Sequence, residues 1–365
     1  MLFLFCQPSL KNKDTVDYLI RTLIIKTLGL KKNYLSFDSF QRNNNSKLYI
    51  FLANFTPRAL FLFLNGLFTF FDLKKLYKKK AITHIFLDSY TIFDLFFFSV
   101  LNFNQNKTKL FVYLRIPYDQ IILTKLFFYF SINKLKTYSK NNLIFLTDTL
   151  ELKNHFKRKF NIECKIVPIP SKITNYKNLK KIDSKKIDIL FPGKSRAEKG
   201  ISLISNIFED IPDDKKITFK FLDNNYIFDL LKKNKKIKPI MLKKNLSYQK
   251  YIESISNSDI LILPYTHKTY KLRSSGIFID AIKLNKFCFV SNNTWMSSLL
   301  KKNGLKIFVL KIWSFEEINK RIKYINENFN KIKKDYTNFR HNILLLNSEK
   351  KFKTTIRKLL INKSK

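Results

Sequence analysis

Glycine, proline and cysteine are scarce in this sequence. Its 365 residues include only 6 Gly, 9 Pro and 3 Cys. So few glycines fit neither a P-loop nor the tight Gly-x-Ser-x-Gly turn that presents a catalytic serine in α/β-hydrolases. Cys6, Cys164 and Cys288 lack Cys-x-x-Cys spacing and lie in apolar, strand-like contexts. This pattern excludes a disulfide framework and a zinc site, and it indicates reduced cysteines in the core.

Acidic residues are few as well. The chain has 69 Lys and Arg against 27 Asp and Glu, a formal net charge of +42. Such an excess favours an anionic partner, which would be nucleic acid, an acidic membrane surface or a phosphorylated substrate. The lysines are spread along the whole chain, and solvated surface lysine explains that distribution equally well. Hydrophobic residues make up 45% of the sequence, which is a globular composition.

No hydrophobic run is long enough to cross a bilayer. The longest strongly apolar stretch, Ala59 to Phe71, is shorter than the ~20 residues that a spanning helix needs. The N-terminal MLFLFCQPSLKNK lacks a basic n-region and its apolar run is too short for a signal peptide, so a first β-strand explains it better. We therefore expect a cytoplasmic protein that is not integral to the membrane.

Short apolar runs alternate with helix-length amphipathic segments in the first half of the chain. Helices are expected at Asp17–Leu28, Phe93–Leu101 and Leu150–Lys159, with Asp148 or Thr149 as the N-cap of the last. The expected strands are Leu2–Cys6, Leu48–Ala53, Ile82–Leu87, Lys109–Leu114, Asn142–Leu146 and Lys165–Pro168. Buried strands separated by helices predict a parallel sheet of βαβ units.

The same alternation returns after a polar segment. Strands are expected at Asp188–Phe191, Ile217–Leu222, Pro239–Leu242, Ile260–Leu263, Phe287–Ser291 and Lys306–Val309, with helices near 200–208, 226–233, 247–256 and 275–284 and from Glu316 onward. The sequence thus predicts a domain at 1–170, a linker at 171–185, a second domain at 186–340 and a basic C-terminal helix at 341–365.

The segment 187–200 (IDILFPGKSRAEKG) places charge at the end of a strand. The strand ends near Gly193, and Arg196 and Lys199 precede the next helix. Ligands of open parallel sheets bind beyond the carboxyl ends of the strands, and a helix N-terminus there favours anions. Arg offers phosphate a planar fork and Lys a point charge. Without context, a basic loop with an ordinary cap is the simpler explanation.

A second junction of this kind lies at 258–281. The strand-like SDILILPY is followed by a loop, and Ser274, Ser275 and Gly276 open the next helix. Backbone amides and hydroxyls there suit a diphosphate, and Asp280, one turn on, suits ribose hydroxyls. Alone, Ser-Ser-Gly is more often only a helix N-cap.

These junctions, the preceding SYQKYIESISNSD and the following SGIFIDAIKLNKFCFVS together resemble the C-terminal domain of GT-B glycosyltransferases, in particular the retaining family 4-like group. Residues 142–170 resemble the last strand, helix and strand of that family's N-terminal domain, whereas residues 1–130 match only in pattern. The resemblance implies an α/β fold of two Rossmann-like domains whose parallel sheets face each other across a cleft.

The resemblance also implies an activity. The expected enzyme is a retaining, hexosyltransferase-like glycosyltransferase that moves a sugar from a nucleoside-diphosphate donor to a glycan or lipid-linked acceptor. Cell-surface polysaccharide assembly is the implied pathway. No cofactor is expected, because the nucleotide sugar is a co-substrate. The sequence has no Asp-x-Asp pair and its four histidines lack metal-ligand spacing, so we expect no metal site.

Donor-site roles follow from the same resemblance. Arg196 and Lys199 would hold the diphosphate and stabilise the charge on the leaving group, which makes them catalytic. Gly193 and residues 274–276 would bind the donor, and Asp280 corresponds to the ribose-binding glutamate of the family. The family's other glutamate, eight residues earlier, falls on Leu272 in this chain. Tyr270, Arg273 or Ser274 would have to replace part of its function.

Polar residues also follow two expected strands in the first half. Asp88 could orient or deprotonate an acceptor hydroxyl and is preferred over His84 as a catalytic residue. Arg115 could bind an acceptor phosphate, and Asp119 lies in the same cluster as a second acceptor-binding candidate. An ordinary cap or turn role is the simpler explanation for each.

Alternative functions stay open at this point. A nucleic-acid-binding protein would suit the charge of +42 and the 17 Tyr and 37 Phe, but most Phe lie in buried patterns and no nucleic-acid module appears. We therefore expect no specific nucleic acid partner. A GT-B protein that binds a sugar nucleotide without catalysis is allowed by Leu272. The aromatic runs at 59–71 and 125–130 allow peripheral attachment to an anionic inner membrane face, although core helices explain the same runs.

Overall fold

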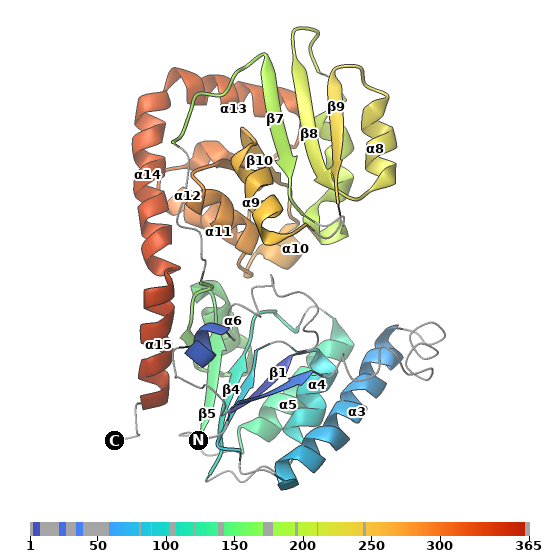
Figure 1. Cartoon of the computed structure of the whole chain (residues 1–365), viewed down its shortest axis with the longest axis vertical. Helices are drawn as coiled ribbons and strands as arrows, with labels where there is room; N and C mark the ends of the chain where they lie inside the picture. The colour runs from blue at the N-terminus through green and yellow to red at the C-terminus, as the bar shows by residue number, and fades with distance from the viewer. Residues whose placement is uncertain are drawn as a thin grey trace. The chain divides into compact units, whose positions relative to one another are not determined.

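The structure, a computed structural model of the chain, describes residues 3–7, 22–26, 34–38, 58–79, 82–88, 90–101, 107–119, 121–137, 142–170, 178–193, 196–209, 211–243 and 246–361. Its contacts divide the chain into two compact units (Figure 1). The first unit comprises Met1–Pro170 with Glu349–Lys365, and the second comprises Ser171–Ser348. Each is built around one six-stranded parallel sheet.

The sheet of the first unit has the order β2-β1-β3-β4-β5-β6. Its strands are β1 (Phe3–Gln7), β2 (Tyr34–Asp38), β3 (His84–Leu87), β4 (Lys109–Tyr113), β5 (Leu143–Thr147) and β6 (Cys164–Ile166). All four residues of β3 are buried, as are the last four of β4. Burial on both faces is what a parallel sheet covered by helices requires, and it accounts for the continuous apolar runs in these segments.

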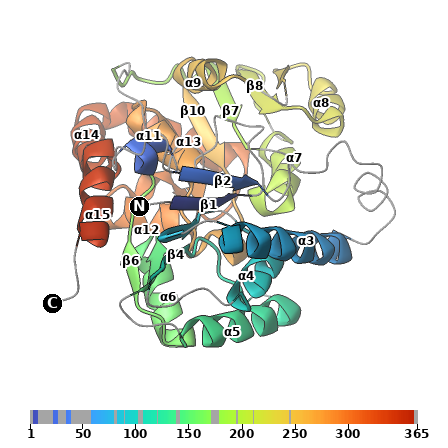
Figure 2. The ribbon, with the colours of Figure 1, turned by 60° about the horizontal axis from the view of Figure 1, so that its bottom comes forward.

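Helices cover both faces of this sheet. The helices α3 (Arg58–Lys79), α4 (Ile92–Ser99) and α5 (Ile122–Leu135) pack side by side in that order, followed along the chain by α6 (Leu150–Phe160) (Figure 2). A different set of helices, the helical residues 22–26 and α15 (Glu349–Ile361), shares one apolar cluster with β3 and β4. In that cluster Phe352 and Ile356 lie with Leu23, Phe86 and Phe111.

Side-chain caps fix where two of these helices begin. Thr91 and Asp94 form a reciprocal capping box at the start of α4. The hydroxyl of Thr149 accepts a hydrogen bond from the backbone amide of Leu152, which makes Thr149 the N-cap of α6. The N-cap predicted at Asp148 or Thr149 is therefore confirmed at the second of these positions.

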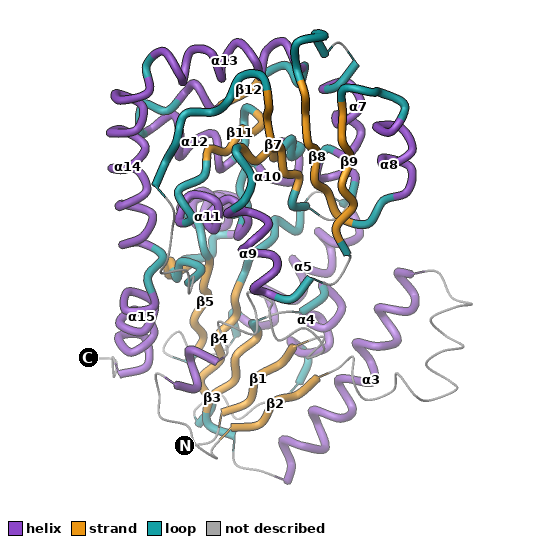
Figure 3. Tube along the Cα trace, turned by 45° about the horizontal axis from the view of Figure 1, so that its top comes forward, coloured by secondary structure: helices purple, strands orange, loops and turns teal. Residues whose placement is uncertain are grey.

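The sheet of the second unit has the order β12-β11-β10-β7-β8-β9, and Figure 3 shows β7, β8 and β9 side by side. The strands are β7 (Lys186–Phe191), β8 (Lys216–Leu222), β9 (Ile237–Leu242), β10 (Ile260–Leu263), β11 (Phe287–Ser291) and β12 (Val309–Leu310). From β7 the chain builds the sheet outward through β8 to β9, then returns to the other side of β7 with β10. The strand order therefore reverses between β7 and β10.

The helices of the second unit connect these strands. They are α7 (Ile204–Ile207), α8 (Asn225–Lys232), α9 (Tyr248–Ser256), α10 (His267–Tyr270), α11 (Gly276–Lys283), α12 (Trp295–Lys302), α13 (Phe315–Glu327) and α14 (Phe329–Leu346), with 3₁₀ turns η1 (Ala197–Lys199), η2 (Ile201–Leu203) and η3 (Lys306–Phe308). The α14 helix runs continuously through residue 341 and ends at Leu346, and α15 begins three residues later as part of the first unit. None of the helices in the described ranges is long and apolar enough to span a membrane.

Three sequence-based expectations differ from the structure. The strand expected at Lys306–Val309 is mostly the 3₁₀ turn η3, and only Val309 and Leu310 pair with β11. The single helix expected at 200–208 is instead one 3₁₀ turn, η2, and the short α7. It begins only at Ile201, because Gly200 has a positive φ of 74°. The strand β2 was not predicted, and the strand expected at Leu48–Ala53 lies outside the described residues.

Candidate functional site

The candidate site lies where the strand order of the second sheet reverses. β7 and β10 are parallel neighbours, with Ile189 opposite Ile260 and Leu190 opposite Leu261. Their carboxyl ends therefore meet at the same edge of the sheet, and both lead into the two junctions singled out in the sequence. Open α/β sheets bind ligands at such a switch point because the loops on its two sides diverge.

A close backbone contact fastens these two loops together. Gly200 has a left-handed φ of 74°, and a Cβ at this position would lie 1.8 Å from the carbonyl oxygen of Pro264. Only glycine accepts both conditions. The backbone amide of Thr266 also donates to the carbonyl of Glu198 at 3.1 Å. The loop after β7 and the loop after β10 thus form one connected surface.

Lys199 lies in an aromatic cage within this surface. Its Nζ is 3.8 Å from the centroid of the Tyr265 ring and 4.7 Å from that of Tyr270, and the two rings are 4.5 Å apart. Burial, together with the neighbouring guanidiniums of Arg273 and Arg196 and against the opposing charge of Glu198, lowers the pKa of Lys199 to about 7. No carboxylate among the described residues forms an ion pair with Lys199. A half-buried lysine that lies against two ring faces is the kind of group that an anionic ligand would stabilise.

Two arginines complete a cationic cluster around Lys199. The Cζ of Arg273 lies 5.4 Å from the centroid of the Tyr270 ring, so Tyr270 contacts two cations. Arg196 is 59% exposed and its guanidinium is 3.5 Å from Glu198, the one carboxylate that acts on Lys199. Three positive charges against one negative charge leave this edge of the sheet with excess positive charge, which attracts anions.

Gly193 and the start of α11 line the same edge. A Cβ on Gly193 would lie 3.4 Å from the ring of Phe191 and 3.6 Å from Cδ of Lys199, so the missing side chain leaves room for the lysine. Ser275 is the N-cap of α11, and its hydroxyl accepts from the backbone amide of Phe278. Ser274 precedes the cap and Gly276 is the first helical residue. The amino end of α11 carries unpaired backbone amides by virtue of helix geometry, and these favour a negative group.

Asp280 lies one turn into α11 and is held from α9. The hydroxyl of Tyr251 lies 3.3 Å from Oδ2 of Asp280 and donates to it. Burial raises the pKa of Tyr251 well above its usual value, and the nearby Asp280 carboxylate raises it further. Tyr251 therefore stays protonated and keeps donating throughout the neutral range, which fixes the orientation of the Asp280 carboxylate.

In the first unit, Asp88 and His84 lie at opposite ends of β3. Asp88 directly follows the strand and is 4% exposed, and it lines a small apolar hollow together with Phe111 and Tyr113. His84 is the first residue of the strand. Burial, reinforced by the charge of Lys109, lowers the pKa of His84 to about 4. His84 is therefore a neutral core residue at neutral pH, and it cannot act together with Asp88.

The other two residues singled out in the first unit have partners inside that unit. The Nε of Arg115 lies 3.6 Å from Oδ2 of Asp148, which follows the neighbouring strand β5. Oδ1 of Asp119 lies 3.0 Å from Nε2 of His155 on α6. Both pairs link strand-end loops to the adjacent element, so a structural role accounts for their position.

The aromatic cage is the part of the site that the sequence did not indicate. Tyr270 and Arg273 were named only as substitutes for the family's missing glutamate, and Tyr265 was not considered at all. The available signal was the spacing of two tyrosines and an arginine in LPYTHKTYKLR, directly after a buried strand. Within the described part of the chain, no group of three or more His, Cys, Asp or Glu side chains could hold a metal ion.

Comparisons with known proteins agree on the fold. No protein-family model and no curated protein sequence matches the chain. Anabaena HepE in complex with UDP superposes with a TM-score of 0.68 at 11% identity, covering 99% of both chains. Sucrose-phosphate synthase from Thermosynechococcus elongatus gives 0.67 at 10% identity, over 99% of this chain and 98% of that one. TarM from S. aureus gives 0.58 at 12% identity, over 82% and 59%.

These neighbours are GT-B glycosyltransferases, and they match an α/β chain with two parallel sheets over nearly its full length. The fold class expected from the sequence is therefore confirmed: the chain has the GT-B fold.

Proposed function

We propose that this protein is a glycosyltransferase whose nucleoside-diphosphate sugar binds at the switch point between β7 and β10. The observation that carries the proposal is the cationic cluster of Arg196, Lys199 and Arg273 on the connected loops after these strands. Structures of Anabaena HepE with UDP and with UDP-glucose share the fold, which supports a uridine nucleotide as the first donor to test.

The proposed roles of the donor-site residues follow from their charge and position. Arg196 is exposed and suited to grip the diphosphate through its planar fork, and Lys199 is held nearby as a second cation. The amides at the start of α11, at residues 274–276, would bind the phosphate from another side. As the glycosidic bond breaks, negative charge grows on the leaving nucleoside diphosphate. Fixed cations and amides at that place lower the barrier because they need no reorganisation.

Asp280 would bind the ribose of the donor. One of its carboxylate oxygens accepts from Tyr251, and the carboxylate would accept ribose hydroxyls with its remaining lone pairs. The sugar itself would meet a different environment from the one in the family, because Leu272 stands in place of a glutamate. We propose that Arg273 and Tyr270 contact the sugar or its diphosphate there, and that the reaction proceeds with retention and without a metal.

The first unit would bind the acceptor. Its candidates are Asp88 as the residue that orients or deprotonates the acceptor hydroxyl, and Arg115 with Asp119 as acceptor-binding residues. In this proposal 1–170 is the acceptor domain and 186–340 the donor domain, joined by the linker 171–185 and followed by the basic segment 341–365. A glycan or lipid-linked acceptor in polysaccharide assembly at the inner membrane face suits the positive charge of the chain.

Ligand binding tests the donor site directly. The full chain is titrated with UDP, GDP, ADP, TDP and CMP by thermal shift and calorimetry, and a nucleotide at ~100 times its Kd should stabilise the fold by about 2.7 kcal/mol. The variant Arg196→Ala with Lys199→Ala should lose this response. Lys232→Ala, which removes an exposed lysine of α8, should keep it. Equal stabilisation by any polyanion in all variants would instead identify a general polycation.

Turnover separates an enzyme from a binding protein. If the preferred nucleotide binds, incubation with its radiolabelled sugar form should release nucleoside diphosphate, slowly to water and faster with a suitable acceptor. Tight binding of the nucleotide sugar without any release would favour the second candidate function, a non-catalytic sugar-nucleotide-binding protein. The observation behind that candidate is Leu272, where the family has a carboxylate.

A further inference from the structure

The helix α5 of the first unit exposes a concentrated apolar surface. Residues 121–130 contain six of the nineteen large hydrophobic side chains that are exposed among the described residues, with Ile122 81% and Leu126 63% exposed. The six are Ile121, Ile122, Leu123, Leu126, Tyr129 and Phe130. Single exposed apolar residues are ordinary on a protein surface, but a contiguous group of this kind marks an interaction site.

This surface is separate from the face of α5 that stabilises the unit. Phe128, Ile132 and Leu135 point into the core and are buried. Phe127 packs edge-on against Phe96 of α4. The helix is therefore apolar on two sides, and only one of them serves the fold. The exposed side needs a different explanation.

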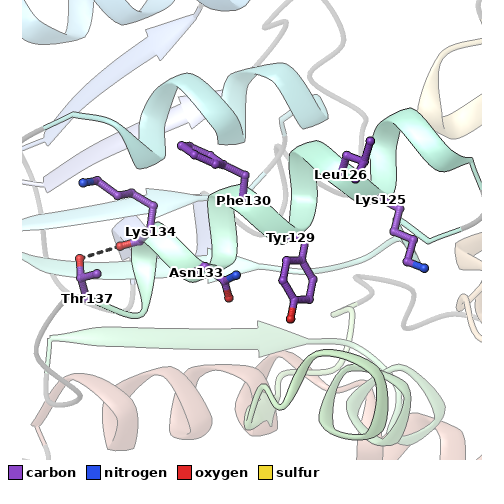
Figure 4. Close-up of a pocket in the computed structure, with 7 residues that line it drawn as sticks. All are labelled: Lys125, Leu126, Tyr129, Phe130, Asn133, Lys134 and Thr137. Atoms are coloured by element: carbon purple, nitrogen blue, oxygen red, sulfur yellow. Dashed lines mark hydrogen bonds between the residues drawn. The ribbon is translucent and has the colours of Figure 1, made fainter.

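Polar and basic side chains lie next to the exposed apolar side chains of α5. Figure 4 shows Phe130 and Lys134 projecting from one side of α5, with Tyr129 and Asn133 on the other. These residues, with Lys125, Leu126 and Thr137, line a hollow of about 490 Å³. Exposed Lys125 lies among the apolar residues, and polar and basic residues follow Phe130. The sequence of α5 contains no Asp or Glu.

Another helix of the same unit also exposes apolar side chains. α3 packs on α4, which packs on α5, and α3 exposes Leu60, Phe68 and Phe71. Exposed lysines follow these residues at 74, 75 and 78. Both helices thus combine exposed aromatic or aliphatic side chains with lysine at their carboxyl-terminal part. Exposed apolar side chains next to lysine suit the boundary between acyl chains and anionic headgroups.

We propose that the exposed side of α5 (residues 121–130 with Lys125 and Lys134) docks this protein on an anionic membrane surface. Ile122, Leu126 and Phe130 would enter the boundary between headgroups and acyl chains. Tyr129 would lie at headgroup depth, where its ring and hydroxyl both find partners. Lys125 and Lys134 would reach anionic headgroups while their aliphatic stems stay on the apolar surface.

A second copy of the chain fits this surface less well. A two-fold interface places the same residues on both sides, so it would bring Lys125 and Lys134 of one copy close to those of the other. With no carboxylate on α5 to compensate, like charges would face each other in a dehydrated contact. An anionic membrane supplies the apolar phase and the negative charge together. The formal net charge of +42 acts in the same direction.

The surface shares no residue with the donor site, so docking and nucleotide binding are tested independently. Purified full-length protein is floated with vesicles of phosphatidylcholine, with or without phosphatidylglycerol, and UDP binding is measured on the same samples. We expect flotation only with phosphatidylglycerol. The double variant Ile122→Glu with Leu126→Glu should lose binding at least tenfold. Leu345→Glu with Leu346→Glu, the same change on exposed leucines of α14, should bind as the wild type does.

A second variant tests the charge separately. Lys125→Gln with Lys134→Gln should weaken partitioning about 25-fold, because each lysine near an anionic surface contributes about fivefold. Unchanged thermal unfolding of all variants shows that the exposed substitutions leave the fold intact. Absence of wild-type binding overturns the proposal. So does equal binding of Ile122→Glu with Leu126→Glu, which would indicate a general polycation. A dimer that this variant dissociates, without vesicle binding, would identify a second copy as the occupant.

Discussion

The two units share a six-stranded parallel sheet but differ in the main partners of the charged side chains at the carboxyl ends of their strands. In the first unit, Arg115 lies against Asp148 and Asp119 against His155. In the second, Lys199 and Arg273 lie against tyrosine rings. Side chains that pair with a neighbouring element of the same unit serve the fold, whereas cations on ring faces keep their attraction for an external anion. The difference indicates that the strand ends of the second unit are the ones suited to bind a phosphate.

Exposed apolar side chains are concentrated in the first unit, the one whose charged strand ends are paired. The first unit concentrates it on α5, whereas the second unit exposes separate residues such as Tyr226, Met241 and Ile312 on different elements. Among the described residues, the unit whose strand ends pair internally thus carries the larger group of exposed apolar side chains. The same α/β architecture therefore supports two kinds of recognition in one chain.

The largest expected effect is the loss of stability on substitution of Gly200 in the second unit. A matched substitution at Gly304 separates the cost of a steric contact from the cost of the backbone conformation. Gly200→Ala should destabilise the fold by about 3 kcal/mol or more and abolish nucleotide binding, because its Cβ would overlap the carbonyl of Pro264. Gly304 has nearly the same φ, 75°, with no heavy atom within 4 Å of a Cβ. Gly304→Ala should cost only about 1 kcal/mol. Urea unfolding of both variants measures the difference, and equal losses would contradict the steric contact.

The second largest effect tests the difference between the charged side chains of the two units. Lys199→Met should weaken UDP binding about 30-fold, since a hydrogen bond to a charged group contributes about 2 kcal/mol. Arg115→Met should leave UDP affinity unchanged and instead lower the free energy of unfolding by about 2 kcal/mol, because Asp148 loses its guanidinium partner. Calorimetry and urea unfolding on both proteins provide the two readouts. The comparison fails if the two variants exchange these phenotypes.

The sequence predicted those strands, caps and junctions that depend on residues close to one another in the chain. Buried strands appeared as continuous apolar runs, and Thr149 was recognisable as a cap from its position before an amphipathic segment. The junctions at Arg196 and Ser275 were found because each follows such a strand. The strand β2 (YLSFD) is half polar, so its apolar pattern was too weak to predict it. The strand expected at Lys306–Val309 failed because an apolar run of four residues fits a 3₁₀ turn equally well.

Contacts between distant segments could not be predicted. Lys199 and Tyr265 are separated by three α-helices, three strands and their loops, and the pairing of β7 with β10 brings them together. The contact of Gly200 with Pro264 depends on the same pairing. For α5 the sequence showed aromatic residues with lysine, but not which side of the helix the core would use. That choice depends on the packing of α4 against Phe127.

A smaller effect is the dependence of UDP affinity on pH. The pKa of Lys199 in the free protein is about 7, so the ammonium loses its proton above neutrality, and a bound diphosphate must restore it. UDP affinity should therefore fall as pH rises from 7 to 9, by up to tenfold per unit. The terminal phosphate of UDP is already ionised over this range, since its second pKa is about 6. Lys199→Met should give a flat profile. A slope that survives this substitution would assign the titration to another group.

The smallest effect distinguishes the ribose from the diphosphate. Tyr251→Phe removes the hydroxyl that donates to Asp280, and the loss of one hydrogen bond of about 1 kcal/mol should weaken UDP binding about fivefold. Inorganic pyrophosphate has no ribose, so its affinity should stay the same in this variant, whereas Lys199→Met should weaken both ligands. Competition of each ligand against a fluorescent nucleotide measures the ratio. If Tyr251→Phe weakened UDP and pyrophosphate equally, Asp280 would act through the shape of α11 and not through the ribose. The second unit would then recognise only phosphate, and its selectivity among nucleotides would have to come from residues other than Asp280.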